Sequence, residues 1–119
     1  MKTIKLFSFI LLLSAMGANL SAQTAKNQSD QQITETFKVS GNCDMCKTRI
    51  EKAVKTVGAS SADWNVKTKL LTVTFNSEKT SLDALGKKIA SVGHDTEKYK
   101  AENKVYNALP ACCKYERTK

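Results

Sequence analysis

The spacing of apolar residues switches between strand-like and helix-like periods, and the order of these segments constrains the fold more than any other feature of the chain. Residues 33–40 alternate loosely between apolar and polar side chains and predict a first strand. After Gly41-Asn42 the apolar spacing becomes helical. The residues that share this predicted helical face are Cys46, Ile50, Ala53, Val54 and Val57. Gly58 follows them as a left-handed cap, so the helix is expected to end there.

Two further strands are predicted after this helix. Residues 62–66 and residues 71–75 each alternate apolar and polar side chains with a period of two, which is typical of a strand with one buried face. The short polar segment Lys67-Thr68 between them indicates a turn. Because the connection is this short, the two strands are expected to pair antiparallel.

A second helix and a last strand complete the pattern. Thr80 and Asp83 fit a capping box, in which Thr80 caps the helix and Asp83 reaches back to it. Gly93 is expected to close this helix. Its apolar face comprises Leu82, Leu85, Ile89 and Val92. Residues 96–101 predict a weaker strand.

The resulting order, strand–helix–strand–strand–helix–strand, defines the fold class. It predicts an α+β protein with a ferredoxin-like βαββαβ arrangement, in which a four-stranded antiparallel sheet carries two helices on one face. We expect this domain to span residues 33–101. Residues 102–119 form a C-terminal extension with two cysteines and the only proline of the chain, Pro110.

The start of the chain has the composition of a secretory signal peptide. Lys2 and Lys5 precede an apolar run over residues 6–13, and small residues follow as far as Ala22. We therefore predict a signal peptide over residues 1–22 and a secreted or periplasmic protein. The run is shorter than the about 20 residues that a spanning helix needs, so no stable membrane insertion is expected after cleavage. A retained membrane anchor is the alternative. The polar residues 23–32 predict a disordered spacer.

Charge and motifs exclude several classes of function. Removal of Lys2 and Lys5 lowers the formal net charge from +8 to +6. The remaining basic residues form no block, and aromatic residues do not alternate with them, so no nucleic-acid partner is expected. The sequence also shows no catalytic triad, phosphate-binding glycine loop or pair of acid–base carboxylates, so we expect no enzyme.

A pair of thiols lies between the first strand and the first helix, in the segment Cys43-Asp44-Met45-Cys46. The partial positive charge at a helix N-terminus favours thiolates, and Lys47 and Arg49 are close enough in sequence to add to it. Two adjacent thiolates suit a soft ion such as Cu(I). Zn(II) is a weaker fit because it normally takes four ligands. The same thiols could instead cycle between dithiol and disulfide.

Residues 41–54 (GNCDMCKTRIEKAV) resemble the heavy-metal-associated domain family, which includes copper chaperones, modules of copper-transporting ATPases and periplasmic mercury-binding proteins. The resemblance covers residues 33–101. It implies the βαββαβ fold, no enzymatic activity, and one soft ion held by Cys43 and Cys46, with Cu(I) expected first and Hg(II) second. The ion would pass to a metal-transporting ATPase or another metal-acceptor domain, and an ion could also bridge a dimer. The residues expected to supply the docking face are Lys47, Arg49, Lys52 and Lys98.

Two positions depart from the family pattern. The family usually has a methionine two residues before the first cysteine, where this chain has Gly41. The loop after the second helix, which lies near the metal in this family, carries His94, the only histidine. His94 is therefore a candidate third ligand, and the alternative is a solvent-facing loop residue.

Cys112 and Cys113 lie outside the resemblance, and three interpretations of them remain open. They could fold back and add thiolates to the metal site, which would also admit Zn(II). They could resolve an oxidised Cys43 or Cys46 by thiol–disulfide exchange. They could also form structural disulfides, as exported cysteines usually do.

An extracytoplasmic thiol–disulfide oxidoreductase is the alternative function for the same Cys43-x-x-Cys46 motif. Two features weigh against it. The thioredoxin family usually has tryptophan directly before its first cysteine, where this chain has Asn42. That family also needs a proline facing the thiols, and Pro110 follows all the predicted elements.

Overall fold

A computed structural model describes residues 31–118 of the chain. The predicted signal peptide and most of the predicted spacer lie outside these residues. The elements in chain order are β1 (Gln32–Lys38), α1 (Asp44–Thr56), β2 (Ala59–Trp64), β3 (Leu70–Asn76), α2 (Leu82–Ser91), α3 (Asn103–Asn107) and the short 3-10 helix η2 (Ala111–Cys113). Among residues 31–118, no helix has both the length and the apolar character needed to cross a membrane.

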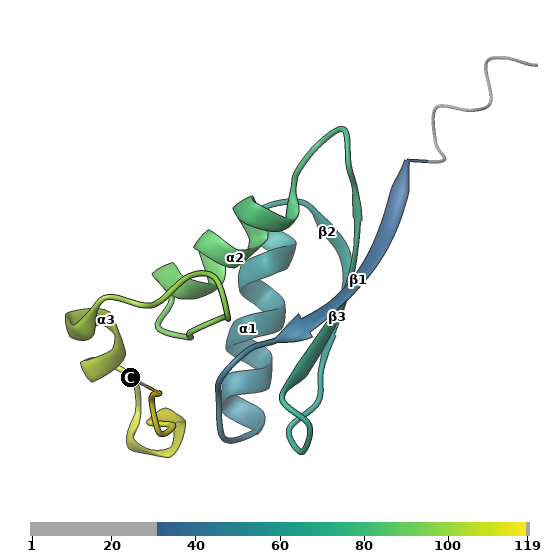
Figure 1. Ribbon diagram of the computed structural model, residues 1–119. Coiled ribbons are helices and arrows are strands. Elements are labelled where there is room, and N and C mark those ends of the chain that lie inside the picture. Colours follow the sequence, from purple (N-terminus) through teal and green to yellow (C-terminus); the bar gives the residue numbers. More distant parts are fainter. Residues whose placement is uncertain (1–30, 119) are drawn as a thin grey trace, which may run out of the picture. The chain divides into compact units, whose positions relative to one another are not determined.

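The three strands form one antiparallel sheet in the order β1-β3-β2. Leu71 of β3 lies opposite Phe37 of β1 on one side and Trp64 of β2 on the other. Helices α1 and α2 both cover the same face of this sheet (Figure 1). The antiparallel pairing of β2 with β3 and the two-layer arrangement are therefore as the sequence predicts.

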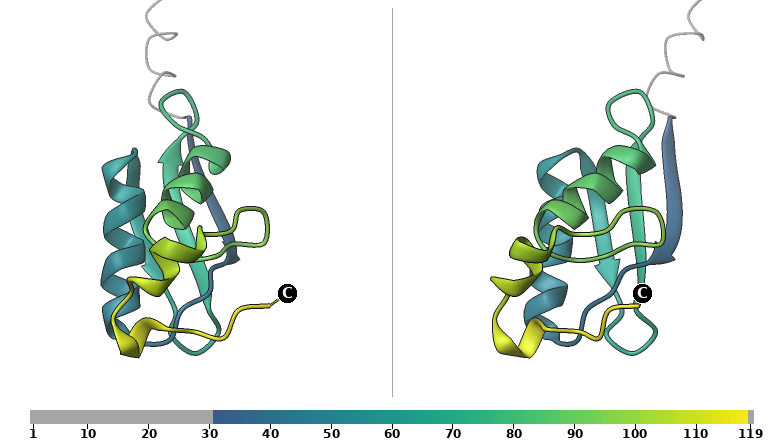
Figure 2. Two further views of the ribbon diagram at one scale, coloured as in Figure 1. Left: turned by 90° about the vertical axis from the view of Figure 1, so that its left-hand side faces the viewer. Right: turned by 60° about the vertical axis from the view of Figure 1, so that its left-hand side comes forward.

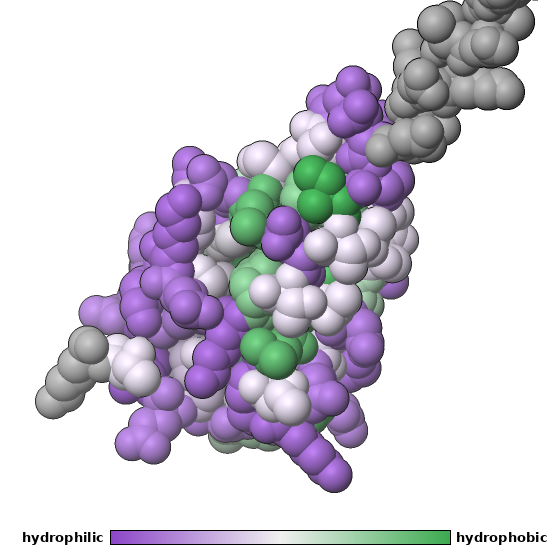
Figure 3. Space-filling model, turned by 45° about the vertical axis from the view of Figure 1, so that its right-hand side comes forward, coloured by the Kyte–Doolittle hydropathy of each residue, from purple (hydrophilic) through white to green (hydrophobic). Residues whose placement is uncertain are grey.

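The core lies between the sheet and the two helices. Its largest fully buried side chains include Trp64, Leu71, Ile50, Leu85 and Ile89. The face of the sheet turned away from the helices is lined partly by threonines that bond across strands, Thr34 with Thr74 at 2.9 Å and Thr36 with Thr72 at 3.1 Å. Seen from the side of the sheet, small apolar groups are separated by polar and neutral side chains (Figure 3).

The second helix begins one residue later than the capping-box prediction requires. Ser81, not Thr80, is the N-cap, and its hydroxyl accepts a hydrogen bond from the backbone N–H of Ala84 at 3.1 Å. The side chain of Thr80 instead packs over Gly58, where an added Cβ would lie 3.1 Å from it. The prediction that Thr80 caps the helix and pairs with Asp83 is thus wrong, because Thr80 is used in packing.

The predicted fourth strand does not form within the described residues. Residues 96–101 make only an isolated bridge between Thr96 and Val39. The chain turns at once, since the backbone N–H of Thr96 donates to the carbonyl of Tyr99 at 2.8 Å. The Tyr99 ring lies against α2, where Gly86 leaves room for it and an added Cβ would lie 2.8 Å away. In residues 31–118 the sheet therefore has three strands instead of the four predicted.

The C-terminal extension is folded against the domain. It comprises α3 and η2, and it runs past the N-terminal end of α1 (Figure 2). Leu109, Cys113 and Tyr115 are buried and belong to the same apolar cluster as the strands and helices. The extension therefore brings its cysteines to the loop that precedes α1.

Candidate metal centre

The loop before α1 is held from beneath by Trp64. The indole N–H of Trp64 donates to the carbonyl of Val39 at 2.9 Å, and its ring lies under Gly41. A Cβ at position 41 would lie 3.0 Å from this ring and 3.2 Å from the Cβ of Cys46. The tryptophan thus occupies the space beneath the loop, which explains why a glycine stands where the family usually has methionine.

Cys43 and Cys46 lie at the N-terminus of α1 with their sulfurs together. Cys43 is the N-cap residue, and Cys46 is in the first turn and fully buried. Their Sγ atoms are 3.6 Å apart. The backbone N–H of Asn42 also donates to the Sγ of Cys46 at 3.4 Å. Free N–H groups and the helix dipole at this end both favour negative charge on sulfur.

The structure brings the tail cysteines to this pair. The Sγ of Cys113 lies 3.7 Å from the Sγ of Cys43. The sulfurs of Cys43, Cys112 and Cys113 all lie within 4.8 Å of one another. Cys112 is exposed, and its Sγ contacts the Sδ of Met45 at 3.8 Å. All four cysteines are free thiols.

The thiols of Cys43, Cys112 and Cys113 differ in pKa. Burial raises the pKa of Cys43, but hydrogen bonds from the backbone N–H of Cys46 and from the neighbouring thiols outweigh it and lower this pKa to about 7. The pKa of Cys112 is raised, chiefly by its hydrogen bond to Cys43. Burial raises the pKa of Cys113 further above its usual range. A thiolate on Cys43 therefore disfavours deprotonation of a second thiol nearby, and a bound cation would remove this repulsion between like charges.

The basic residues around the thiols differ in role. The ammonium group of Lys47 bonds to the carboxylates of Glu51 and Asp63, each at 2.7 Å, and these partners raise the pKa of Lys47. Its charge is therefore largely neutralised. Arg49 is directed at the sulfurs, with its Nη1 at 3.9 Å from the Sγ of Cys113. Arg49 is thus the cation with a direct contact to a thiol.

His94 is buried, so the solvent-facing alternative is wrong. Its Nδ1 lies 2.9 Å from the carbonyl oxygen of Ser40 and must donate to it, which leaves a lone pair on Nε2. Burial lowers the pKa of His94 and keeps the ring neutral. Nε2 is the one buried side-chain nitrogen or oxygen in residues 31–118 that has no hydrogen-bond partner. His94 does not belong to the group formed by Cys43, Cys112 and Cys113, and its role as a ligand stays a prediction.

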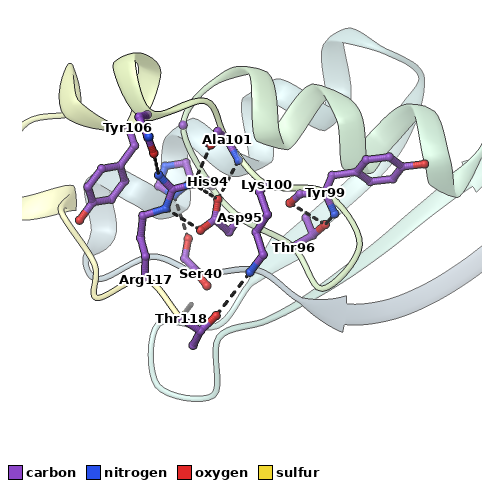
Figure 4. A network of polar contacts seen from close by, with 12 residues as sticks. Ser40, His94, Asp95, Thr96, Tyr99, Lys100, Ala101, Tyr106, Arg117 and Thr118 are labelled. Atoms are coloured by element: carbon purple, nitrogen blue, oxygen red, sulfur yellow. Dashed lines mark hydrogen bonds and ion pairs between the residues drawn. The ribbon is translucent and has the colours of Figure 1, made fainter.

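A polar cluster fastens the end of the tail to the loop after α2 (Figure 4). The hydroxyl of Tyr115 donates to the carbonyl of Gly93 at 2.8 Å and accepts from the N–H of Asp95 at 2.9 Å. The guanidinium of Arg117 pairs with the buried carboxylate of Asp95 at 2.8 Å and donates to the carbonyl of Ala101 at 2.6 Å. We call this set, Tyr115 and Arg117 with Asp95, the tail clasp.

The sequence did not predict that Trp64, Tyr115 and Arg117 support the site. The alternation of apolar and polar residues predicts that Trp64 lies in a strand, but it does not indicate that the indole ring lies under the loop. Tyr115 and Arg117 follow the second cysteine pair with a spacing of two, in the run CCKYER. A tyrosine and an arginine so close to a thiol pair were the available signal that the extension is ordered.

An α+β domain with two helices on one face of an antiparallel sheet, and with thiols gathered where the first helix begins, is the architecture of a small soft-metal-binding domain. Residues 36–95 match the heavy-metal-associated domain. The chain is also 36% identical over 95 residues to the periplasmic component of the mercuric transport protein of Shewanella putrefaciens, covering 79% of this chain and 93% of that protein. The protein belongs to the heavy-metal-associated domain family, in which the domain binds metal and is non-catalytic.

Other relatives agree with this family. A copper-exporting P-type ATPase of Staphylococcus saprophyticus is 41% identical over 56 residues, which is 46% of this chain but only 7% of the ATPase. Among solved structures, the CopZ metallochaperone aligns with a TM-score of 0.52 and 27% identity, covering 54% of this chain and 98% of that one. The water-soluble region of the P-type ATPase CopA from Bacillus subtilis aligns with a TM-score of 0.52 and 31% identity, covering 55% of this chain and 44% of that one. These alignments support the fold of the domain.

Proposed function

We propose that the protein is an exported carrier for one soft heavy-metal ion, with Cu(I) as the first candidate and Hg(II) as the second. The observation that carries the proposal is the pair of sulfurs on Cys43 and Cys46, 3.6 Å apart at the N-terminus of α1. Soft thiolates select soft ions, and the loop offers no carboxylate set that would suit Mg²⁺ or Ca²⁺.

The electrostatics of the loop favour capture of such an ion near neutral pH. Because the pKa of Cys43 is lowered to about 7, a large fraction of this thiol is already ionised there. Cys43 is half-buried while Cys46 is fully buried. An incoming ion would therefore meet Cys43 first, and Cys46 would then close on it with loss of its proton.

Transfer to an acceptor requires a surface that attracts an acidic partner. Lys47 and Lys98 are engaged by carboxylates of the protein itself. Arg49 and Lys52 on α1 remain as the basic residues that could steer a partner to the site. The similarity to a copper-exporting ATPase supports a metal-transporting ATPase or another acceptor domain as that partner. The periplasmic relative supports the predicted export. Cleavage after Ala22 stays a prediction.

Native mass spectrometry of residues 23–119 tests the proposal. The protein would be fully reduced and offered Cu(I), Hg(II) and Zn(II) in turn. We expect one Cu(I) or Hg(II) per chain and weaker uptake of Zn(II). The double variant Cys43→Ser/Cys46→Ser should lose the ion, while Ser77→Ala, at an exposed position directly after β3, is the control. No uptake by the reduced protein would contradict the proposal.

The same samples distinguish the carrier from a thiol–disulfide oxidoreductase, although the family assignment already argues against an enzyme. An oxidoreductase would pass the two electrons of the Cys43–Cys46 dithiol to a substrate disulfide, which becomes two thiols as the protein forms its own disulfide. We expect the reduced protein to bind metal and to reduce a model disulfide no faster than free glutathione does.

A further inference from the structure

The C-terminal tail places a third sulfur at the site, and we propose that Cys113 is a ligand of the ion. The ion would then be held by Cys43, Cys46 and Cys113 in a three-thiolate site instead of by the loop pair alone. This inference rests on the proposed function, because it concerns the same ion. It specifies that the ion has three sulfur ligands, a coordination that both Cu(I) and Hg(II) accept.

The sulfur spacing favours three ligands over two. With a metal–thiolate bond of about 2.3 Å, two sulfurs on opposite sides of a linear ion lie about 4.6 Å apart. Three sulfurs around one ion lie about 4.0 Å apart with the same bond length. The Sγ atom of Cys43 is 3.6 Å from that of Cys46 and 3.7 Å from that of Cys113. Both distances are nearer to the three-coordinate spacing than to the two-coordinate one. The sulfur of Cys112 also lies within 4.8 Å of those of Cys43 and Cys113, so Cys112 is the competing third ligand.

The position of Cys113 is built into the fold. Cys113 is fully buried, and its backbone N–H donates to the carbonyl of Pro110 at 2.8 Å within the turn of η2. Two residues later, the tail clasp fixes the chain through the hydroxyl of Tyr115. The ion pair of Arg117 with Asp95 then secures the end. The thiol is therefore held toward Cys43 from both sides.

The charge around Cys113 also suits a ligand. Three thiolates exceed the charge of Cu(I) or Hg(II), so the complex carries a net negative charge that burial would disfavour. Arg49 supplies a compensating cation, with its Nη1 at 3.9 Å from the Sγ of Cys113. Cys112 has no such neighbour among its hydrogen bonds and is exposed beside Met45. Substitution of Cys112 is therefore the matched comparison for substitution of Cys113.

A third internal ligand changes how the ion leaves. A thiol of an acceptor can add directly to a two-coordinate ion, but here it would have to displace Cys113 first. Cys113 gives up a proton when it binds the ion and recovers one when it is displaced, and no electron moves. The tail therefore slows release and makes the protein hold its ion longer than the loop pair alone would.

X-ray absorption spectroscopy of the reduced protein (residues 23–119) loaded with one Hg(II), and separately with one Cu(I), tests the proposal. We expect three sulfur ligands in the wild type and in Cys112→Ser, and two in Cys113→Ser. Release to an excess of a competing small dithiol should be on the order of tenfold faster or more in Cys113→Ser, since affinity differences between variants of one site appear mainly in the dissociation rate. Two sulfurs in the wild type, or three in Cys113→Ser, would overturn the proposal.

The variants need a control for folding, because Cys113 is buried. Cys113→Ala preserves the apolar character of the position, and its two-dimensional amide NMR spectrum should keep the dispersed signals of β3 and α2. A folded Cys113→Ala protein that binds the ion through two sulfurs supports the proposal. Equal coordination in all the proteins overturns the third ligand but leaves the carrier intact. Failure of the wild type to bind any ion contradicts the proposed function itself.

Discussion

The two cysteine pairs meet at one place, but the protein positions them by different kinds of contact. The loop pair is set by apolar packing, because the Trp64 ring lies under Gly41 and Cys46 is in the core beside Ile50. The tail pair also packs into the core, through Leu109, Cys113 and Tyr115, but it depends in addition on polar contacts, in which Tyr115 and Arg117 bond to the loop after α2.

This difference teaches that the position of the loop pair should be as stable as the core, while the position of the tail pair should depend on pH. Apolar burial depends little on pH. An ion pair and a shared hydroxyl depend on the ionisation of their members and are lost when one partner is removed. The tail should therefore detach from the domain under conditions in which the loop pair remains folded.

The largest effect is expected from removing the support of the loop. Trp64→Ala deletes a fully buried ring and its hydrogen bond to Val39, and it should lower the free energy of unfolding by about 3–5 kcal/mol. Urea denaturation followed by circular dichroism measures this. Val66→Ala, in the turn that follows β2, is the control and should cost far less. A loss below about 1 kcal/mol for Trp64→Ala would show that the loop does not depend on the ring.

The tail clasp should break selectively when its cation is removed. Arg117→Ala leaves the carboxylate of Asp95 buried without its partner, which should weaken tail docking by about 2–3 kcal/mol. Hydrogen exchange should then become faster at the amide of Cys113 but not at those of β3. Glu116→Ala alters a neighbouring exposed residue and should leave both unchanged. Uniformly faster exchange throughout the domain would show that the tail and the core unfold together.

A smaller effect should follow from adding one methyl group beneath the loop. Gly41→Ala places a Cβ at 3.0 Å from the Trp64 ring, so the loop must shift, at a cost of about 1–3 kcal/mol. Because the loop carries Cys43, the variant should also bind Cu(I) more weakly, as competition with a chromogenic chelator would show. Unchanged stability and affinity would mean that the ring can move aside.

The smallest effect should be a graded loosening of the tail on acidification. Burial raises the pKa of Asp95, but hydrogen bonds from Arg117 and from the N–H of Ala101 lower it below its usual value. The stability that Asp95 contributes is therefore present above pH of about 3.9 and is lost as the pH falls through its lower folded pKa. His94 also has a lowered pKa, because of burial, so its contribution begins to fall below a pH of about 6.5.

Protonation of Asp95 and protonation of His94 both lower stability as the pH falls, and NMR of the metal-free, reduced protein tests this prediction. The amide NMR signals of Cys113 and Tyr115 should shift toward unstructured positions as the pH is lowered from 7.5, while those of β3 stay in place. Arg117→Ala should shift at higher pH than the wild type does. Tail signals that strengthen in acid would contradict this sign.

The parts of the structure that could be predicted are those governed by local periodicity. The buried face of α1, with Cys46, Ile50 and Val54, has the spacing of a helix, and the β2–β3 pair has the alternation of a hairpin. The cysteine motif and its place before a helix were likewise visible in the sequence.

The parts that could not be predicted depend on contacts between distant residues. Residues 96–101 around Tyr99 predict a strand, but the Tyr99 ring fits the space over Gly86 instead. The pairing of Arg117 with Asp95 spans most of the last quarter of the chain and follows no period. The meeting of Cys113 with Cys43 depends on that pairing, so local patterns left its role open.

The covalent connection between the tail and the domain has a consequence for binding strength. Cys113 is joined to the loop after α2 by a short ordered segment, so its thiol competes for the ion at an effective concentration on the order of millimolar or more, whatever the protein concentration. A free thiol of equal intrinsic affinity would need to be supplied at that concentration to replace it. Dilution of the protein would therefore leave this third contact intact, whereas any contact that relied on a second molecule would dissociate.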